Sequence, residues 1–311
     1  MSRDAIGDLA YWDEWIEFES AAISKRIQLS LGPSANPTYE PQYVRDLAFK
    51  HLKNMLRRYS RGDPTTELQQ YFEPFLHYWE ESMRLGASVW TPEQQIKRHS
   101  WAINLEHYMD SFWLVGLALA LNIPDAQWQR LLALIGNEGE DALLDRVIAS
   151  RQPSRKIGTA LCYPTPYKKL RAASDAPKPK QAALLNAFVE NWYADLAKAV
   201  ESGRQKQGYP IKQPYWYTYH TPMKGAYFGY WCIEAAAAAK AFGLDDRLCL
   251  GHPHYPGDLL RQDTVTPADA SRLPATLVAS LNVPDPLPPG TPQNFSNWEL
   301  LKMVIKNKFK P

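Results

Sequence analysis

Apolar residues recur every three or four positions through most of the first 150 residues, which is the spacing of one helix face. The first stripe predicts a helix that ends before Gly32-Pro33, and it comprises Leu9, Trp12, Ile16, Ile23 and Ile27. A second stripe follows Pro41 and comprises Val44, Leu47, Ala48, Leu52, Met55, Leu56 and Tyr59. Two amphipathic helices are therefore expected at the start of the chain.

Start signals predict two further helices. Asp63-Pro64 supplies a cap and a first-turn proline for a third helix, which Pro74 would kink or divide. Thr91-Pro92 with Gln94 forms a capping box, in which side chains and backbone N–H groups bond reciprocally at a helix start. We expect the helix that begins there to run to Leu121.

Shorter helices are predicted in the rest of the chain. Asp125 can cap a helix through Ile135, and the acidic segment EDALLDRVIAS after Gly139 predicts another. Helical spacing returns over 181–202 and again over 223–242. A further capping box, made by Ser296 and Glu299, predicts a basic helix at the end of the chain.

The organisation of the chain changes between residues 152 and 180, where prolines and lysines replace helical periodicity. This change predicts a joint between a helical subdomain of residues 1–151 and another of residues 181–311. Alternation of apolar and polar residues, which is typical of strands, is scarce throughout. We therefore expect an all-α fold, a multi-helix bundle of two closely docked helical subdomains.

Composition narrows the class of protein. The chain has 311 residues, of which 45% are hydrophobic, enough for a substantial core. Its longest apolar run, residues 112–121, is half of the roughly 20 residues that a membrane-spanning helix needs. The first residues show no basic region followed by an apolar one, so we expect a cytoplasmic protein without a membrane partner. Three cysteines without a CxxC pair indicate reduced thiols.

The net charge of +2 conceals an asymmetry. Residues 1–150 hold 14 basic and 21 acidic side chains, a net charge of −7, and residues 151–311 hold 21 and 12, a net charge of +9. Such halves could attract each other or present two differently charged surfaces. The basic half, which includes lysines near its end, also leaves open a regulator that binds nucleic acid.

Carboxylates and histidines are the candidates for chemistry. Asp245-Asp246 follows an apolar helix, but the third acid that a divalent metal site on one helix face requires is absent, and a cap is the simpler explanation. His252 and His254 lack a recognisable third ligand. No nucleophile elbow or phosphate-binding loop stands in the sequence. We therefore expect no enzyme activity, metal, cofactor or small-molecule substrate, although an all-α enzyme with an unrecognised acidic or histidine site stays an alternative.

A second acidic group precedes residue 150. It has two interpretations: a helix start stabilised by the helix dipole, or an acidic patch for a basic partner. We predict Glu138, Glu140, Asp141 and Asp145, together with Asp245 and Asp246, as residues that bind such a partner.

The segment 225–259 holds the most distinctive pattern, reading GAYFGYWCIEAAAAAKAFGLDDRLCLGHPHYPGDL. Gly225 and Gly229 are four residues apart, which on a helix would leave one side small enough for close packing. Glu234 is a carboxylate in an apolar stretch, so it must be exposed or paired. We expect a structural pair with Arg247, Lys240 or an aromatic hydroxyl.

Motifs in both halves resemble the immunity proteins of polymorphic nuclease effectors, which are bacterial DNase toxins. LRRYSRGDP from Leu56 resembles the family's tyrosine-serine-x-glycine turn, and Tyr108 to Ser150 is similar to its apolar helix followed by an acidic EDxLLD helix. The second half is similar to its GYWxxEAAA, DD and YPxDL elements in order. The positions that match or flank these elements are Gly225, Gly229, Tyr230, Trp231, Glu234, Tyr255, Pro256 and Asp258.

The resemblance implies an all-helical cytoplasmic protein that acts in interbacterial competition through type VI secretion. Such a protein binds its cognate DNase toxin, one molecule to one, and silences it without catalysis or direct contact with nucleic acid. The slightly basic net charge departs from what a basic toxin would favour. The acidic N-terminal half could nevertheless supply the attraction.

Overall fold

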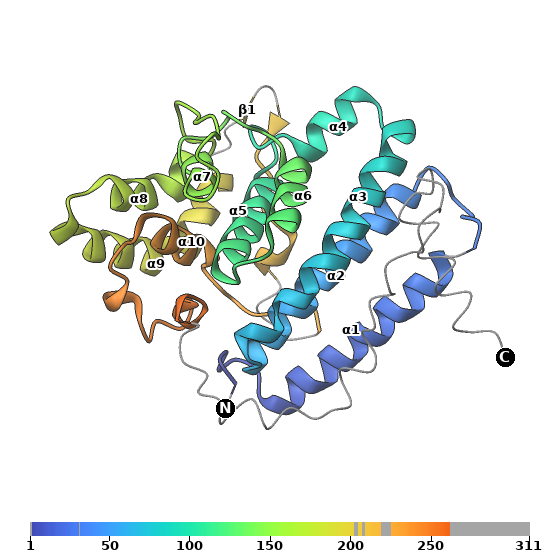
Figure 1. The fold of residues 1–311 in the computed structure, drawn as a ribbon, viewed down its shortest axis with the longest axis horizontal. Helices are drawn as coiled ribbons and strands as arrows, with labels where there is room; N and C mark the ends of the chain where they lie inside the picture. Colours follow the sequence, from blue (N-terminus) through green and yellow to red (C-terminus); the bar gives the residue numbers. More distant parts are fainter. Residues whose placement is uncertain (1, 31, 202–204, 207–208, 219–224, 262–311) are drawn as a thin grey trace, which may run out of the picture.

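Three long helices form one side of the molecule (Figure 1). The computed structural model describes residues 2–30, 32–201, 205–206, 209–218 and 225–261. In it, α1 (Leu9–Ser30) packs on α2 (Glu40–Arg61), which packs on α3 (Phe72–Val89). The apolar stripe predicted on α2 is entirely buried. Both amphipathic helices predicted at the start of the chain are thus confirmed.

The middle of the molecule is built around α5 (Leu105–Ala120), whose side chains are buried along almost its whole length. It lies close to α10 (Ile233–Phe242). A Cβ added at Gly116 would lie only 2.8 Å from the Cβ of Ala237. The five alanines of α10, residues 235–239, are all buried. Small residues on both helices therefore allow their backbones to approach.

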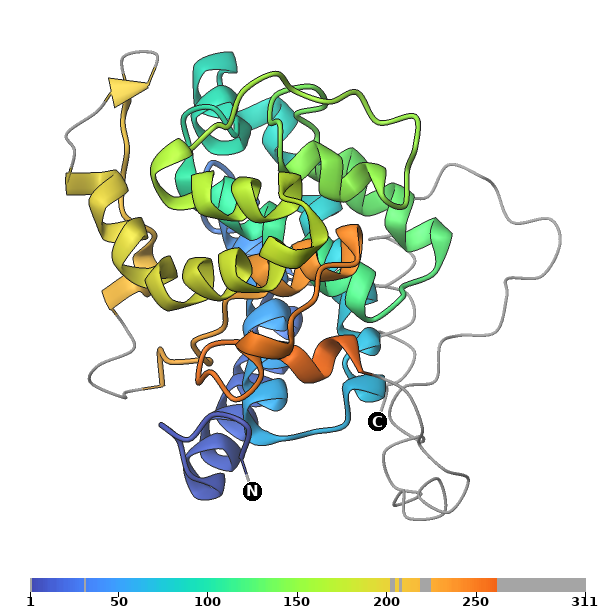
Figure 2. The ribbon, with the colours of Figure 1, turned by 90° about the vertical axis from the view of Figure 1, so that its left-hand side faces the viewer.

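The remaining helices surround this pair. α6 (Asp125–Ile135) packs on α3 and α5, while α8 (Pro164–Asp175) pairs with α9 (Lys178–Glu201). α7 (Leu144–Ala149) lies against α5 and α10. Short 3-10 helices occur at Tyr215–Thr218 (η3), Arg247–Cys249 (η4) and Gly257–Leu260 (η5). Figure 2 shows α8, α9 and the segment leading to η5 on one side of the bundle.

The all-α fold is confirmed, and its one sheet among the described residues is a minimal hairpin. It joins β1 (Gln205–Lys206) to β2 (Tyr209–Pro210) in antiparallel register. A single apolar cluster contains side chains from both predicted subdomains, which are therefore closely docked. None of the described helices combines the length and hydropathy that crossing a bilayer requires. The predicted terminal helix lies outside the described residues.

Several predicted boundaries are wrong. The capping box of Thr91 and Gln94 forms, but it starts α4 (Pro92–His99), and a separate start at Asn104 opens α5. Asn104 accepts the N–H of His107 at 3.0 Å, so its side chain satisfies one donor of the new helix. The predicted span therefore holds two helices, each with its own N-terminal cap.

Proline and aspartate positions also differ from expectation. Asp63-Pro64 leads only into 3-10 turns, η1 (Thr65–Glu67) and η2 (Gln69–Tyr71), and Pro74 sits in the first turn of α3 without breaking it. Asp125 is the first residue of α6 and does not cap it with its side chain. The predicted joint 152–180 contains α8, whose two prolines stand in its first turn, where a missing N–H costs nothing.

Candidate functional site

The two sets of family-like motifs meet at one joint, where the end of α2 contacts the segment before α10 and η5. The hydroxyl of Tyr59 donates to Asp258, whose other oxygen binds Arg3. Arg3 also donates to the carbonyl oxygens of Tyr59, at 2.8 Å, and Asp63, at 2.7 Å. The YPxDL turn is thereby fastened to the tyrosine-serine turn and to the start of the chain.

Ser60 is the centre of this joint and is fully buried. Its Oγ accepts the indole N–H of Trp231 at 2.9 Å and lies 2.8 Å from the carbonyl oxygen of Leu56. Its carbonyl oxygen accepts the backbone N–H groups of Arg3 and Asp4. Sequence reasoning missed these contacts, because nothing in the spacing of the motifs says that they touch.

Gly225 and Gly229 do not lie on a helix, so the predicted helix over 223–242 is wrong for residues 225–232, while residues 223–224 lie outside the described residues. Gly225 has φ +64° and Gly229 has φ +106°, conformations that favour glycine. A Cβ at Gly225 would lie 2.2 Å from the ring of Trp15, and one at Gly229 would lie 2.1 Å from Ser60 Oγ. Both glycines are required by close approach in an irregular segment, and α10 begins only at Ile233.

The other residues singled out in this segment are also structural. Tyr230 is buried, and its ring meets that of His254 at 4.2 Å. Tyr255 is buried and donates to Asp246 at 2.7 Å, and Pro256 is buried at the start of η5. The motifs of the second half therefore hold the scaffold together.

The acidic pair at 245–246 is occupied by internal bonds. Asp246 is buried and accepts from Tyr255 and, at 2.5 Å, from Arg261. Asp245 is half-buried and accepts from the guanidinium and backbone N–H of Arg247, which hold its pKa at about 2. Asp245 thus closes a local turn, as a loop aspartate commonly does.

Asp141 is wholly buried and organises the loop that precedes α7. Its Oδ1 accepts the backbone N–H groups of Leu143 and Leu144, at 2.8 and 2.7 Å, and the hydroxyl of Tyr108 at 3.1 Å. Its Oδ2 accepts the N–H of Cys162 at 2.6 Å. The structure corrects the sequence interpretation of Asp141 as a surface residue, since no partner can reach this carboxylate.

Asp145 is equally buried and binds other backbone groups of the same loop. Its Oδ2 accepts the N–H groups of Gly139, Asp141 and Gly158, and its Oδ1 pairs with Arg155 at 2.7 Å. Burial raises the pKa of the Asp145 carboxyl, while these donors act in the opposite direction. Asp145 likewise belongs to the interior, in contrast to the predicted docking patch.

Glu138 and Glu140 are the exposed members of this acidic group. Glu138 accepts the backbone N–H of Lys156 at 2.7 Å. The helix-start interpretation holds for the aspartates, because Asp145 lies in the first turn of α7 and Asp141 accepts the N–H of Leu144, whereas the two glutamates precede the helix. These two glutamates are thus the only residues of the first predicted group that a partner could contact.

Glu234 is fully buried on α10 and is paired with aromatic groups, as one of the alternatives predicted. Its Oε1 accepts the hydroxyl of Tyr167 at 3.1 Å and the indole N–H of Trp192 at 3.3 Å. Burial raises the pKa of its carboxyl to about 7, although these donors act in the opposite direction. Lys240 is exposed and Arg247 binds Asp245, so neither of these cations is its partner.

The raised pKa of Glu234 predicts a measurable pH dependence. Because its folded-state pKa exceeds the usual value of 4.5, the stability it contributes is present below about pH 4.5 and is lost as pH rises towards 7. We expect the stability advantage of the wild type over Glu234→Gln to fall by about 2 kcal/mol between pH 5 and pH 8. Urea unfolding of both proteins at several pH values measures this difference. The exposed Glu190→Gln is the control, and an equally large change there would contradict the assignment.

A charged cleft of about 500 Å³ lies between α1, α2, α5 and the residues Tyr215, Gly225 and Ala226. Asp110 and Glu106, one turn apart on α5, face Arg45 and Lys53, with Arg45 3.7 Å from Asp110. Burial and the neighbouring Glu106 raise the pKa of Asp110 to about 7, while burial lowers that of Lys53 to about 8. The lining groups are thus nearly balanced in charge. Sequence reasoning missed this cleft because its residues come from four distant segments.

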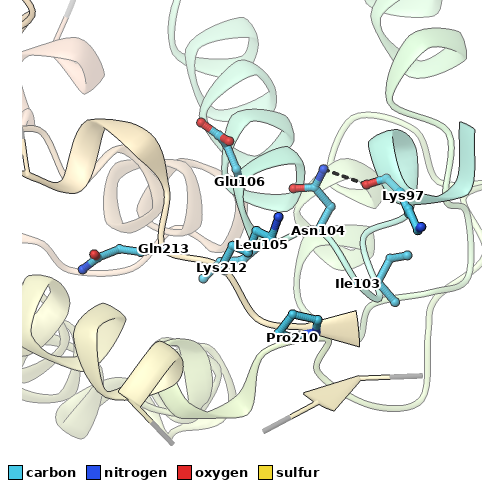
Figure 3. Close-up of a pocket in the computed structure, with 8 residues that line it drawn as sticks. All are labelled: Lys97, Ile103, Asn104, Leu105, Glu106, Pro210, Lys212 and Gln213. Atoms are coloured by element: carbon cyan, nitrogen blue, oxygen red, sulfur yellow. Dashed lines mark hydrogen bonds between the residues drawn. The ribbon is translucent and has the colours of Figure 1, made fainter. Parts of the chain in front are cut away.

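A second hollow of about 380 Å³ adjoins the cleft through Glu106 (Figure 3). It lies between the start of α5 and the segment carrying Pro210, Lys212 and Gln213. Asn104 is held there by its bond to the carbonyl oxygen of Lys97 at 3.0 Å. The side chains that line this hollow include an amide, a carboxylate and lysines. None of them is arranged as a nucleophile beside a base.

Histidines and cysteines form no metal centre in the described part of the chain. No three His, Cys, Asp or Glu side chains gather there closely enough to hold an ion. His99 and His107 are packed among aromatic rings, and burial lowers the pKa of both imidazoles. All three cysteines are buried free thiols.

Two family models together match most of this all-helical chain, and both describe immunity proteins. Residues 3–133 match the model for the N-terminal part of PoNe immunity proteins (PoNi), and residues 139–259 match the model for their C-terminal part. The chain therefore belongs to the PoNe immunity protein family, whose members protect against nuclease toxins.

The fold occurs among solved structures. The crystal structure of protein PA2201 from Pseudomonas aeruginosa is 18% identical in sequence, with a TM-score of 0.59, over 84% of this chain and 90% of that one. No curated protein matches the chain. The two family models meet between residues 133 and 139, ahead of the predicted joint at 152–180, and the subdomain boundary stays a prediction.

Proposed function

We propose that this protein protects the cell that makes it by binding a cognate DNase toxin in the cytoplasm, one molecule to one, and blocking its activity. The match of both family models across residues 3–259 carries this proposal. The buried motifs explain how a common scaffold can serve different toxins. Recognition then falls to exposed positions, and competition through type VI secretion is the setting we propose.

Electrostatic attraction supports the choice of partner. A DNase binds a polyanion and presents a basic surface for it. Residues 1–150 carry a net charge of −7, so this half can attract such a surface over a distance of about 10 Å at moderate salt. Apolar contacts formed after the encounter would then set the lifetime of the complex.

The decisive experiment uses the toxin encoded beside this protein. We expect a tagged toxin to retain the full chain through purification. Its DNase activity should fall linearly as the protein is added and should vanish at one equivalent. A toxin that neither binds this protein nor loses activity would refute the proposal.

Charge reversal at Glu138 and Glu140 tests long-range attraction. Both side chains are exposed and lie in the acidic half. We expect Glu138→Lys with Glu140→Lys to slow association with the toxin several-fold and to weaken its salt dependence, with little change in dissociation. Stopped-flow mixing at several salt concentrations measures this. An unchanged association rate would remove these two glutamates from the encounter.

A further inference from the structure

α1 presents a helix face that no other described helix covers. It packs on α2 with the side of Trp12, Ile16 and Ile23, and Figure 1 shows it on the side of α2 away from α3. Its buried Glu19 is held by Lys50 and by Arg57, at 3.2 Å from the latter. The inner side of α1 is therefore fixed, and the opposite side is open.

A large aromatic side chain interrupts this outer face, since Phe18 is 59% exposed. Ile6 and Leu9 are about half exposed, at 48% and 49%, but Leu9 is nine positions before Phe18 and therefore lies on the opposite side of the helix. The ring of Phe18 is positioned by Trp15, at 5.3 Å between ring centroids. An open hollow of about 960 Å³ lies beside Ile6 and Leu9. A large exposed aromatic side chain on an uncovered helix face can anchor a protein–protein interface.

Acidic side chains surround these apolar groups. Asp13, Glu14 and Glu17 are exposed on the same side of α1, and Asp8 is exposed just ahead of it. Asp13 pairs with Arg61 at 2.8 Å, whereas Glu14 and Glu17 form no ion pair among the described residues. Their charges are therefore available to a partner. A surface with an aromatic centre and an acidic rim fits a basic protein surface.

We propose that this face of α1, with Phe18 as its apolar anchor and Glu14 and Glu17 as its acidic rim, docks on the basic surface of the nuclease toxin. The inference rests on the proposed function, because charge complementarity to a DNA-binding protein selects the partner. It moves the docking surface away from the loop at 138–145. Two carboxylates of that loop are buried, and the loop offers no comparable apolar group beside its exposed glutamates except Ile157.

Phe18→Ala is the most direct test of the docking surface. Leu248→Ala is its matched control, since Leu248 is equally exposed, at 59%, but lies on η4 beside α9. With immobilised cognate toxin, we expect Phe18→Ala to raise the dissociation rate at least tenfold with an unchanged melting temperature. Leu248→Ala should dissociate like the wild type. Equal dissociation rates for both variants, or a greater effect of Leu248→Ala, would overturn the proposal.

Charge reversal at two sites distinguishes residues that contact the bound toxin from residues that only attract it. Glu14→Lys with Glu17→Lys changes the net charge as much as Glu138→Lys with Glu140→Lys does. We expect the first pair both to slow association and to raise the dissociation rate, and the second to affect association alone. A covering of α1 by residues 262–311 or by a second copy would instead lower the melting temperature of Phe18→Ala and leave toxin dissociation unchanged, which would overturn the proposal. A wild-type protein that fails to bind the toxin would refute the proposed function itself.

Discussion

Replacing Asp141 by alanine is expected to lower the free energy of unfolding by about 4 kcal/mol or more. The carboxylate accepts three backbone N–H groups, from Leu143, Leu144 and Cys162, and the hydroxyl of Tyr108. All of these bonds lie in the interior, where each donor that loses its acceptor costs about 1–3 kcal/mol. The loop before α7 would lose its anchor at both ends.

Urea unfolding checks this prediction, with Glu140→Ala as the matched control. Glu140 is the preceding residue and is exposed, so its replacement should change stability by no more than about 0.5 kcal/mol. Asp141→Asn should fall between the two, because its amide keeps one acceptor oxygen but sets an NH2 group against N–H donors. If Asp141→Ala unfolds at the same urea concentration as Glu140→Ala, the carboxylate does not organise the loop.

This contrast explains why the sequence could not show which carboxylates of the acidic group are buried and which are exposed. Glu138, Glu140, Asp141 and Asp145 lie within eight residues and look alike as a charged run. Whether a carboxylate faces water or an array of N–H groups depends on how the chain between residues 136 and 163 folds back. A variant at Asp141 that lost toxin binding would report unfolding, and its effect should not be assigned to an interface.

The helices that pack by one face were predictable from the sequence. α1, α2 and α9 follow stripes that tertiary packing respects, because burying such a stripe is the main source of helix stability in a protein. The break between α4 and α5 was not predictable, since both sides are helix-forming and only the cap at Asn104 marks it. α8 was not predicted, because its prolines were interpreted as loop residues. They stand instead in the first turn of the helix.

The docking surface on α1 left a weak signal in the sequence. Phe18 lies off the apolar stripe of that helix and between two glutamates, where a surface position would ordinarily be polar. The pattern shows the exception but gives no measure of its exposure. The structure adds that measure, and it shows that no other described helix covers the face of α1 that carries Phe18.

Gly229→Ala is expected to destabilise the protein by about 3 kcal/mol or more, from backbone strain and overpacking together. Gly229 has φ +106°, and the added Cβ would lie 2.1 Å from Ser60 Oγ and 2.4 Å from the indole nitrogen of Trp231. Those two atoms are hydrogen-bonded to each other in a buried joint, so neither can move without leaving a polar group unpaired. The destabilisation comes from this joint with α2, since Gly229 does not itself lie on a helix and makes no helix-to-helix contact.

Gly251→Ala isolates the steric part of this effect. Gly251 has φ +86°, and a Cβ added there would meet nothing within 4 Å. Its replacement should therefore cost only the backbone strain of about 1–2 kcal/mol. Urea unfolding of the two variants gives the difference, and the tryptophan fluorescence should shift in Gly229→Ala alone, because only there is the Trp231 indole displaced from Ser60. Equal losses of stability in both variants would show that the joint yields to a methyl group, and that the approach of the two family motifs is looser than these contacts require.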